Sequence, residues 1–444
     1  MFKEFSKTLT IAIPLIISNI SQVSLGLIDS AMIGAVDYKQ LAASSLVINL
    51  VAIPQVLGIG MTMAMSPLIA IANGQQDVHK ASKVLFNGFL LCTATAAIIA
   101  VSMVLGKAIL FHLGQDVIVA QLAQQYYVVM AWSLLPMLMF LAVKQFADAL
   151  EFTKTAMLLS IISMPLNAFL NWVFIYGNLG APRLELFGTG IATLITRIII
   201  AITLIVIVLR HKTFQPYIQA RHKAWKFSFK TWRELLHIGI PSSMQYGMEA
   251  GAFSVSGIMI GWLGATAQAA HQIALNLAST TFMAALGLSL AGSIRVANAY
   301  GRNDTNQMRS VGTSTITGGL FYGCFCALLF IVLRQQLPYI FTNNNEVALL
   351  ASTLLVFGAL FQISDATQAI GVGLLRGTKD VKLPTAFVAI AYWAIGIPVG
   401  YYLAFVVKMG ATGIWLGFVS GLTVSSILLN LRFLKRSRML MVTG

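Results

Sequence analysis

The sequence predicts an all-α integral membrane protein with twelve transmembrane helices in two six-helix lobes. Composition is the first observation: of the 444 residues, 58% are hydrophobic and 10% are charged, whereas soluble domains carry about 25% charged residues. The second is that apolar runs of about 20 residues or more, the length with which an α-helix crosses a bilayer, recur along the whole chain. Only short segments separate these runs, so no soluble domain fits between them.

The apolar runs follow one another as twelve successive spans. We expect them near residues 8–35, 42–72, 85–106, 122–143, 156–177, 187–209, 234–262, 268–294, 311–337, 347–375, 384–407 and 410–431. The second, seventh and tenth runs are longer than a hydrocarbon core of about 30 Å requires, which predicts helices that tilt or project beyond it.

The distribution of positive charge supports an even number of spans. When the N-terminus and the loops after even-numbered spans are put on one side, that side holds 23 of the 29 Lys and Arg, the other side holds five, and Arg197 lies within a span. Lys and Arg accumulate in cytoplasmic loops, so we expect both termini in the cytoplasm and a multi-pass protein of the bacterial cytoplasmic (inner) membrane. This distribution explains the net charge of +15 without a nucleic-acid partner.

The two halves of the chain resemble each other. Residues 9–50 align with 236–277 at a constant offset of 227. Shared positions include Pro14/Pro241, Gly34/Gly261 and Asn49/Asn276. Because each half holds an even number of spans, both copies enter from the same side, which predicts pseudo-twofold symmetry about an axis along the membrane normal.

The duplication predicts the domain organisation. We expect an N-terminal six-helix lobe at 1–210, a basic cytoplasmic linker at 211–233 and a C-terminal six-helix lobe at 234–444. Two such lobes enclose a central cavity and give alternating access when they rock about it. The linker, rich in Lys, Arg and aromatic residues, is typical of an amphipathic segment that lies on anionic lipid headgroups.

Three carboxylates occupy apolar spans: Asp29, Glu249 and Asp365. Each costs roughly 2.5–3.5 kcal/mol on insertion scales, so such a group normally faces a protein interior or a watery cavity and binds something there. The three acids therefore predict an ion or substrate pathway. Acids near loops (Glu4, Asp77, Asp304 and Asp380) are interpreted as solvated charges.

Glu249 and Asp365 are predicted to lie at similar depth in the C-terminal lobe. Glu249 is about 24 Å beyond Arg233 and Asp365 about 16 Å before Arg376, at 1.5 Å per helical residue. Two carboxylates at low dielectric repel unless a cation or proton lies between them. The pair therefore predicts a site that exchanges Na⁺ or H⁺, with Na⁺ as the metal ion; the alternative is a hydrogen-bonded structural pair.

Asp29 is predicted in the outer half of the N-terminal lobe, about 33 Å beyond Lys7. The polar side chains available to meet it are Asn167 and Asn171, on one helix face at i and i+4, and Thr193. Buried Asn in a membrane span also serves as interhelical hydrogen-bonding glue. The residues alone leave a binding role and a structural role equally open.

Several segments resemble the multidrug and toxic compound extrusion (MATE) transporters. They are IPLIISNISQVSLGLIDSAMIG, AAHQIALNLAS, LLRGTKDVKLP and MPLNAFLNWVFIYG, the last followed by GTGIATLITR. The resemblance covers essentially the whole chain and implies two six-helix lobes that export drugs against an inward flow of Na⁺ or H⁺.

The same resemblance implies roles for single residues. Asp29 matches the acid of the first lobe, Asn167 and Thr193 match its polar companions, and Asn171 stands where some members have Asp. That departure leaves the first-lobe site one acid fewer. Glu249 and Asp365 match the second-lobe acids of the NorM-like branch.

We therefore expect a monomeric secondary antiporter, not an enzyme, that exports lipophilic cationic drugs in exchange for Na⁺ or H⁺. Its partners are these drugs, the coupling cation and membrane lipids, and it needs no cofactor. The alternative is a flippase for lipid-linked oligosaccharides or lipids. A flippase favours several cations in its cavity, yet only Arg197 lies within a predicted span. No nucleotide-binding motif, catalytic triad or metal cluster supports an enzyme.

Overall fold

The computed structural model describes residues 2–112 and 117–443, and this part of the chain holds helices and no strands. The helices of the first half are α1 (Phe2–Gly34), α2 (Tyr38–Thr62), α3 (Met65–Gly74), α4 (Val78–Leu105), α5 (Val117–Ala149), α6 (Thr153–Tyr176) and α7 (Glu185–Arg210). Two short helices follow, α8 (Gln215–Gln219) and α9 (Arg221–Ala224). The second half contains α10 (Phe229–Gly261), α11 (Ala265–Gly301), α12 (Thr305–Leu333), α13 (Asn345–Gly377), α14 (Lys382–Ala389), α15 (Ile397–Tyr401) and α16 (Ala411–Thr443).

Each of the twelve predicted spans corresponds to one helix or to a helix pair. The second span comprises α2 and α3, and the eleventh comprises α14 and α15 with the π-helical segments Ile390–Gly396 and Tyr402–Val406. Within the described residues, eleven spans are both long and apolar enough to cross a membrane. The remaining long helix, α10, forms the seventh span; it has 33 residues but is more polar than the others, since it carries Arg233, Glu234 and Glu249.

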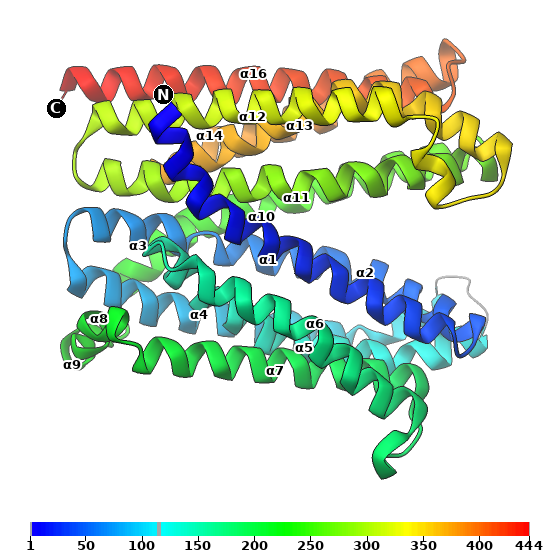
Figure 1. Cartoon of the computed structure of the whole chain (residues 1–444), viewed down its shortest axis with the longest axis horizontal. Coiled ribbons are helices and arrows are strands. Elements are labelled where there is room, and N and C mark those ends of the chain that lie inside the picture. Colours follow the sequence, from blue (N-terminus) through cyan, green and yellow to red (C-terminus); the bar gives the residue numbers. More distant parts are fainter. Residues whose placement is uncertain (1, 113–116, 444) are drawn as a thin grey trace. The chain divides into compact units, whose positions relative to one another are not determined.

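The chain divides into two compact units. The first unit is Ile17–Ser243, and the second unit is Met244–Gly444 together with Met1–Ile16. Within the first unit, α5 packs against α2, α4 and α7; within the second, α13 packs against α11, α12 and α16, beside which it runs in Figure 1. Each unit is thus a helical bundle around one central helix, and the core of the first unit includes Val47, Tyr126 and Leu134.

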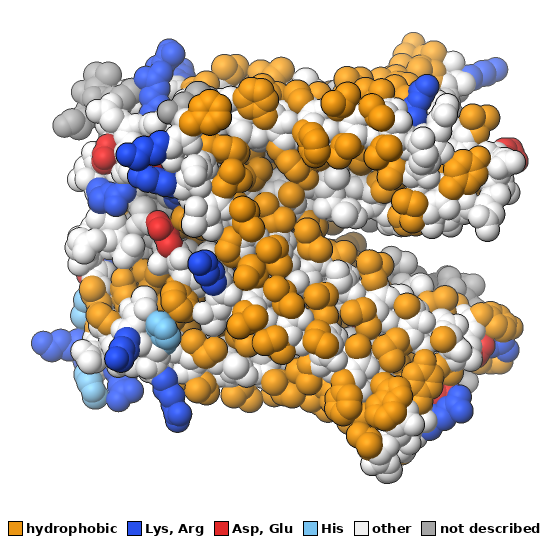
Figure 2. All heavy atoms as spheres, viewed as in Figure 1, with side chains coloured by type: hydrophobic (Ala, Val, Ile, Leu, Met, Phe, Trp, Pro, Cys, Tyr) orange, Lys and Arg blue, Asp and Glu red, His pale blue; other side chains and the backbone are white. Residues whose placement is uncertain are grey.

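The surface of each unit suits a lipid environment. In Figure 2 hydrophobic side chains cover the middle of each unit on the face shown, while Lys and Arg gather toward the helix ends. Large apolar side chains such as Ile98, Phe321 and Leu328 are exposed in the middle of long helices. Because a bilayer is as apolar as these side chains, this exposure is what a membrane-spanning bundle requires.

The duplication is visible in a turn that occurs twice. Asp77 caps α4 and Asp304 caps α12, each accepting a backbone N–H at 2.8 Å. The preceding residues, Gln76 and Asn303, both adopt left-handed backbone with φ of 59° and 57°. These positions are separated by the 227 residues that relate the two sequence copies. Asp77 also explains why α4 begins at Val78, ahead of the predicted span.

The interpretation of Glu4 and Asp380 as solvated charges is wrong. Asp380 is buried and accepts a hydrogen bond from Arg432 Nε at 2.7 Å, while Glu4 pairs with the buried Arg295. Both acids lie close to Lys or Arg at a helix end, where an ion pair replaces water as the partner of the carboxylate. For these two acids, a position near a loop in the sequence therefore does not mean that the carboxylate is exposed to water.

The linker between the halves docks onto the first unit by its aromatic and polar side. Trp225 stacks on Phe86 of α4 with ring centroids 5.6 Å apart, and its Nε1 donates to Ser82 Oγ. The fully buried Asn87 donates to Lys226 O at 3.1 Å and accepts from Ser228 N at 2.9 Å. The linker's basic side chains remain exposed, so the segment is amphipathic, with its apolar side against protein.

Replacing Asn87 by alanine is expected to release the linker. The change leaves Ser228 N–H and Lys226 C=O without their partner, which costs about 2 kcal/mol and raises the population of the open linker by about 30-fold. The population of the open linker is measured by trypsin cleavage of the detergent-solubilised protein after Lys223 or Lys226. The variant is expected to form two fragments of similar size faster than the wild type. Asn178→Ala is the matched control, because the Asn178 side chain is partly exposed and donates to the nearby Trp172 O, away from the linker. Equal cleavage rates for both variants would show that Asn87 does not hold the linker.

Candidate functional site

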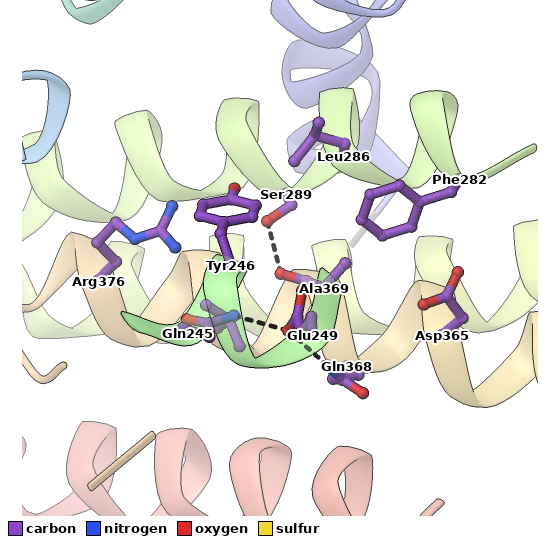
Figure 3. Close-up of a pocket in the computed structure, with 11 residues that line it drawn as sticks. Gln245, Tyr246, Glu249, Phe282, Leu286, Ser289, Asp365, Gln368, Ala369 and Arg376 are labelled. Atoms are coloured by element: carbon purple, nitrogen blue, oxygen red, sulfur yellow. Dashed lines mark hydrogen bonds between the residues drawn. The ribbon is translucent and has the colours of Figure 1, made fainter. Parts of the chain in front are cut away.

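A pocket lies within the second unit, between α10, α11 and α13 (Figure 3). The residues that line it are Gln245, Tyr246, Glu249, Phe282, Leu286, Ser289, Asp365, Gln368, Ala369, Val372 and Arg376. Those on α13 recur at i, i+3, i+4, i+7 and i+11 from Asp365, which is one face of an α-helix. The pocket therefore brings Glu249 and Asp365 to one place, as their depths predict.

Glu249 is held by two amides. Its Oε1 accepts hydrogen bonds from Gln245 Nε2 at 3.0 Å and from Gln368 Nε2 at 3.1 Å, and Figure 3 shows it between these two side chains. The helix turn that carries it is fixed from outside by Trp393, whose Nε1 donates to Met248 O at 3.2 Å. Trp393 lies in the π-helical segment Ile390–Gly396, so this wide turn helps to place Glu249.

Asp365 has a different environment. Its side chain is only 7% exposed, yet among the described residues none donates a hydrogen bond to its carboxylate. In Figure 3 it lies along α13 from Gln368, on the side away from Arg376. A buried carboxylate without a donor costs free energy, which a bound proton or cation removes.

Arg376 is the pocket residue that the sequence reasoning missed. Its side chain is 4% exposed, and its guanidinium lies over the Tyr246 ring, 5.8 Å from the centroid. It follows the expected span 347–375 by one residue, so the sequence alone places it at the end of that span and not in a site. Its spacing of eleven residues from Asp365, about three helical turns, was a usable signal that both face one way.

The first unit contains a second polar site, around Asp29. Asn171 Nδ2 donates to Asp29 Oδ1 at 2.7 Å, and Thr193 Oγ1 donates to Asp29 Oδ2 at 3.0 Å. Asn167 bonds to both companions, at 3.2 Å to Asn171 and 3.4 Å to Thr193. All four side chains are buried. The three residues named as companions of Asp29 thus form one network with it, contributed by α1, α6 and α7.

The two sites share one arrangement of amide and carboxylate. In each, an amide nitrogen donates to the carboxylate, while the amide oxygen, Asn171 Oδ1 or Gln368 Oε1, is buried and accepts no hydrogen bond from any residue that the structure describes. Unpaired oxygens beside a carboxylate are the ligands that hard cations such as Na⁺ prefer. The donor set therefore fits Na⁺ or a proton. No cluster of three or more His, Cys, Asp or Glu occurs in the described part of the chain.

In the described part of the chain, twelve spans made of single helices or helix pairs, with a carboxylate–amide site in each of the two units, define a polytopic membrane transport protein. A family model described as MatE matches the chain twice, at residues 14–173 and 241–402. The chain belongs to this family. The two matches begin at Pro14 and Pro241, which the sequence repeat pairs with each other.

Relatives and solved structures agree with this membership. The chain is 34% identical over 441 residues to the "Probable multidrug resistance protein NorM" of Bradyrhizobium diazoefficiens, covering 98% of this chain and 94% of that protein. It is 31% identical over 447 residues to the "Multidrug resistance protein NorM" of Aliivibrio fischeri, covering 97% and 95%. The crystal structure of the eukaryotic MATE transporter AtDTX14 superposes with a TM-score of 0.88 at 22% identity, covering 99% and 98%. The predicted family and fold class are confirmed.

Proposed function

We propose that this protein is a secondary antiporter that exports lipophilic cationic drugs in exchange for Na⁺ or H⁺. The observation that carries the proposal is the pocket in which Glu249 and Asp365 lie together with one arginine, inside helices that span the membrane. The names of the relatives, multidrug resistance proteins, supply the class of cargo. Binding of a cation between the acids favours the conformation that releases drug outward, and by reciprocity drug and cation change each other's affinity equally.

Asp29 is proposed as a second and weaker cation site, with Asn167, Asn171 and Thr193 as its polar ligands. Its single carboxylate already accepts two hydrogen bonds, whereas Asp365 accepts none from the described residues. Less free energy is therefore gained when a cation arrives at Asp29.

The proposal includes the setting in which the antiporter works. We infer a monomer in the bacterial cytoplasmic (inner) membrane with both termini in the cytoplasm, and two lobes, 1–210 and 234–444, that rock around the cargo. Its partners are the drug, the coupling cation and lipids, without a cofactor or nucleic acid. A lipid-linked precursor flippase is the alternative, but the pocket's excess of acids over arginine favours cations over pyrophosphate.

Efflux from vesicles with separate gradients tests this function. The purified protein is reconstituted in liposomes loaded with ethidium, and a Na⁺ gradient and a pH gradient are imposed one at a time. One gradient is expected to accelerate ethidium release by at least about 10-fold, within the range of coupling free energies between two ligands. Liposomes loaded with ethidium but lacking the protein serve as the control for leak. Acceleration by neither gradient would exclude an antiporter of this kind.

A further inference from the structure

The three charged side chains of the second-unit pocket do not balance. Glu249 and Asp365 contribute two negative charges and Arg376 one positive charge. With all three ionised, the pocket carries a net charge of −1.

Arg376 is an unpaired cation inside the protein. No carboxylate lies within ion-pair distance of its guanidinium among the described residues, and its Nε is buried without a hydrogen-bond partner. The Arg376 guanidinium makes a cation–π contact with the ring of Tyr246, which lies on the turn of α10 that precedes Glu249. A buried charge without a contact partner is stabilised by opposite charge at longer range, because the low dielectric weakens screening.

We propose that Arg376 is the fixed internal counter-ion of the acid pair, so that the pocket takes up one monovalent cation in each transport cycle. The inference rests on the proposed coupling at Glu249 and Asp365. Arg376 neutralises one of the two acids permanently, and the arriving Na⁺ or H⁺ neutralises the other. Exchange of one such cation for one monovalent drug cation then moves no net charge across the membrane.

A purely structural role is the competing explanation. Arg376 lies in the last turn of α13, where a cation also stabilises the carboxyl end of a helix. A capping role requires the positive charge at that position whatever the acids are. A counter-ion role instead depends on the sum of charges in the pocket, and paired substitutions separate the two.

The test measures ethidium efflux in proteoliposomes as a function of the driving cation, with the membrane potential clamped at two values. The wild type and Arg376→Lys are expected to give a Hill coefficient of about 1 and no dependence on potential, whereas Arg376→Gln gives about 2 and a potential-dependent rate. Glu249→Gln makes the pocket neutral and loses cation dependence. The double variant Glu249→Gln/Arg376→Gln restores the net pocket charge of −1, and its efflux again depends on the driving cation.

The double variants decide the outcome. If Glu249→Gln/Arg376→Gln and Asp365→Asn/Arg376→Gln both fold, by their melting in detergent, and neither recovers cation dependence, Arg376 is not the counter-ion while the antiporter function stands. A wild-type Hill coefficient near 2 would overturn the single-cation inference in the same way. Absence of any cation dependence in the wild type would overturn the inference together with the proposed function. Arg302→Gln, which removes an exposed cation from another helix end, is the matched control for charge.

Discussion

Replacing Asp365 by asparagine is expected to lower cation-driven drug efflux by about 100-fold, near the upper limit of coupling between two ligands on one protein. Asparagine keeps the size and hydrogen-bonding capacity of the side chain but removes its charge. Because no described residue donates to the Asp365 carboxylate, the substitution breaks no hydrogen bond in the protein. The loss would therefore report on the charge that attracts the coupling cation.

Glu249→Gln is expected to have a loss of similar size, since it removes the second acid of the pocket. The matched control is Asp380→Asn, which removes a buried carboxylate of the same unit that pairs with Arg432 instead of lining the pocket. This control should lower the melting temperature while efflux keeps its response to the cation gradient. Cation-driven efflux by all three variants is compared through the initial rates of ethidium efflux at a saturating cation gradient. Normal cation-driven efflux by Asp365→Asn would remove the pocket from the coupling mechanism.

The membrane fold was predictable because its causes are local in the sequence. Each span is a run of apolar residues, and the bilayer imposes helices on such runs. The acids Glu249 and Asp365 stood out for the same reason, because a charge in an apolar run is costly wherever the helix faces. Their approximate depth followed from counting residues along a helix, and the structure places both on one pocket.

The ligands around the acids depend on packing, which the sequence does not display. Gln368 and Arg376 share a helix face with Asp365, but which helix meets that face follows from the arrangement of α10, α11 and α13. The sequence does not show that Arg376 reaches the pocket, because a cation near the end of an apolar run resembles a loop residue. The π-helical segment that contains Trp393 escapes prediction because its hydrogen bonds shift register without a distinct composition.

Gly373→Leu is expected to be the most destabilising single substitution near the pocket. A Cβ at Gly373 would lie 2.6 Å from the backbone oxygen of Ser289, so α11 and α13 touch at this point. Ser289 also bonds α13 directly, donating to Ala369 O at 2.6 Å. A leucine forces the two helices apart, which costs about 3 kcal/mol and lowers the melting temperature by on the order of 10 °C.

The separation of α11 and α13 also opens the pocket, because Ser289 and Ala369 line it. We therefore expect Gly373→Leu to lose cation-driven efflux even in the fraction that remains folded. Gly257→Leu is the matched control: Gly257 lies in α10 of the same unit, and a Cβ there meets no atom within 4 Å. Fluorescence-detected size-exclusion after heating gives the melting temperatures of both variants. If Gly373→Leu has the melting temperature of the wild type, α11 and α13 can move apart at this contact without loss of stability. The close approach of the two helices would then not maintain the shape of the pocket.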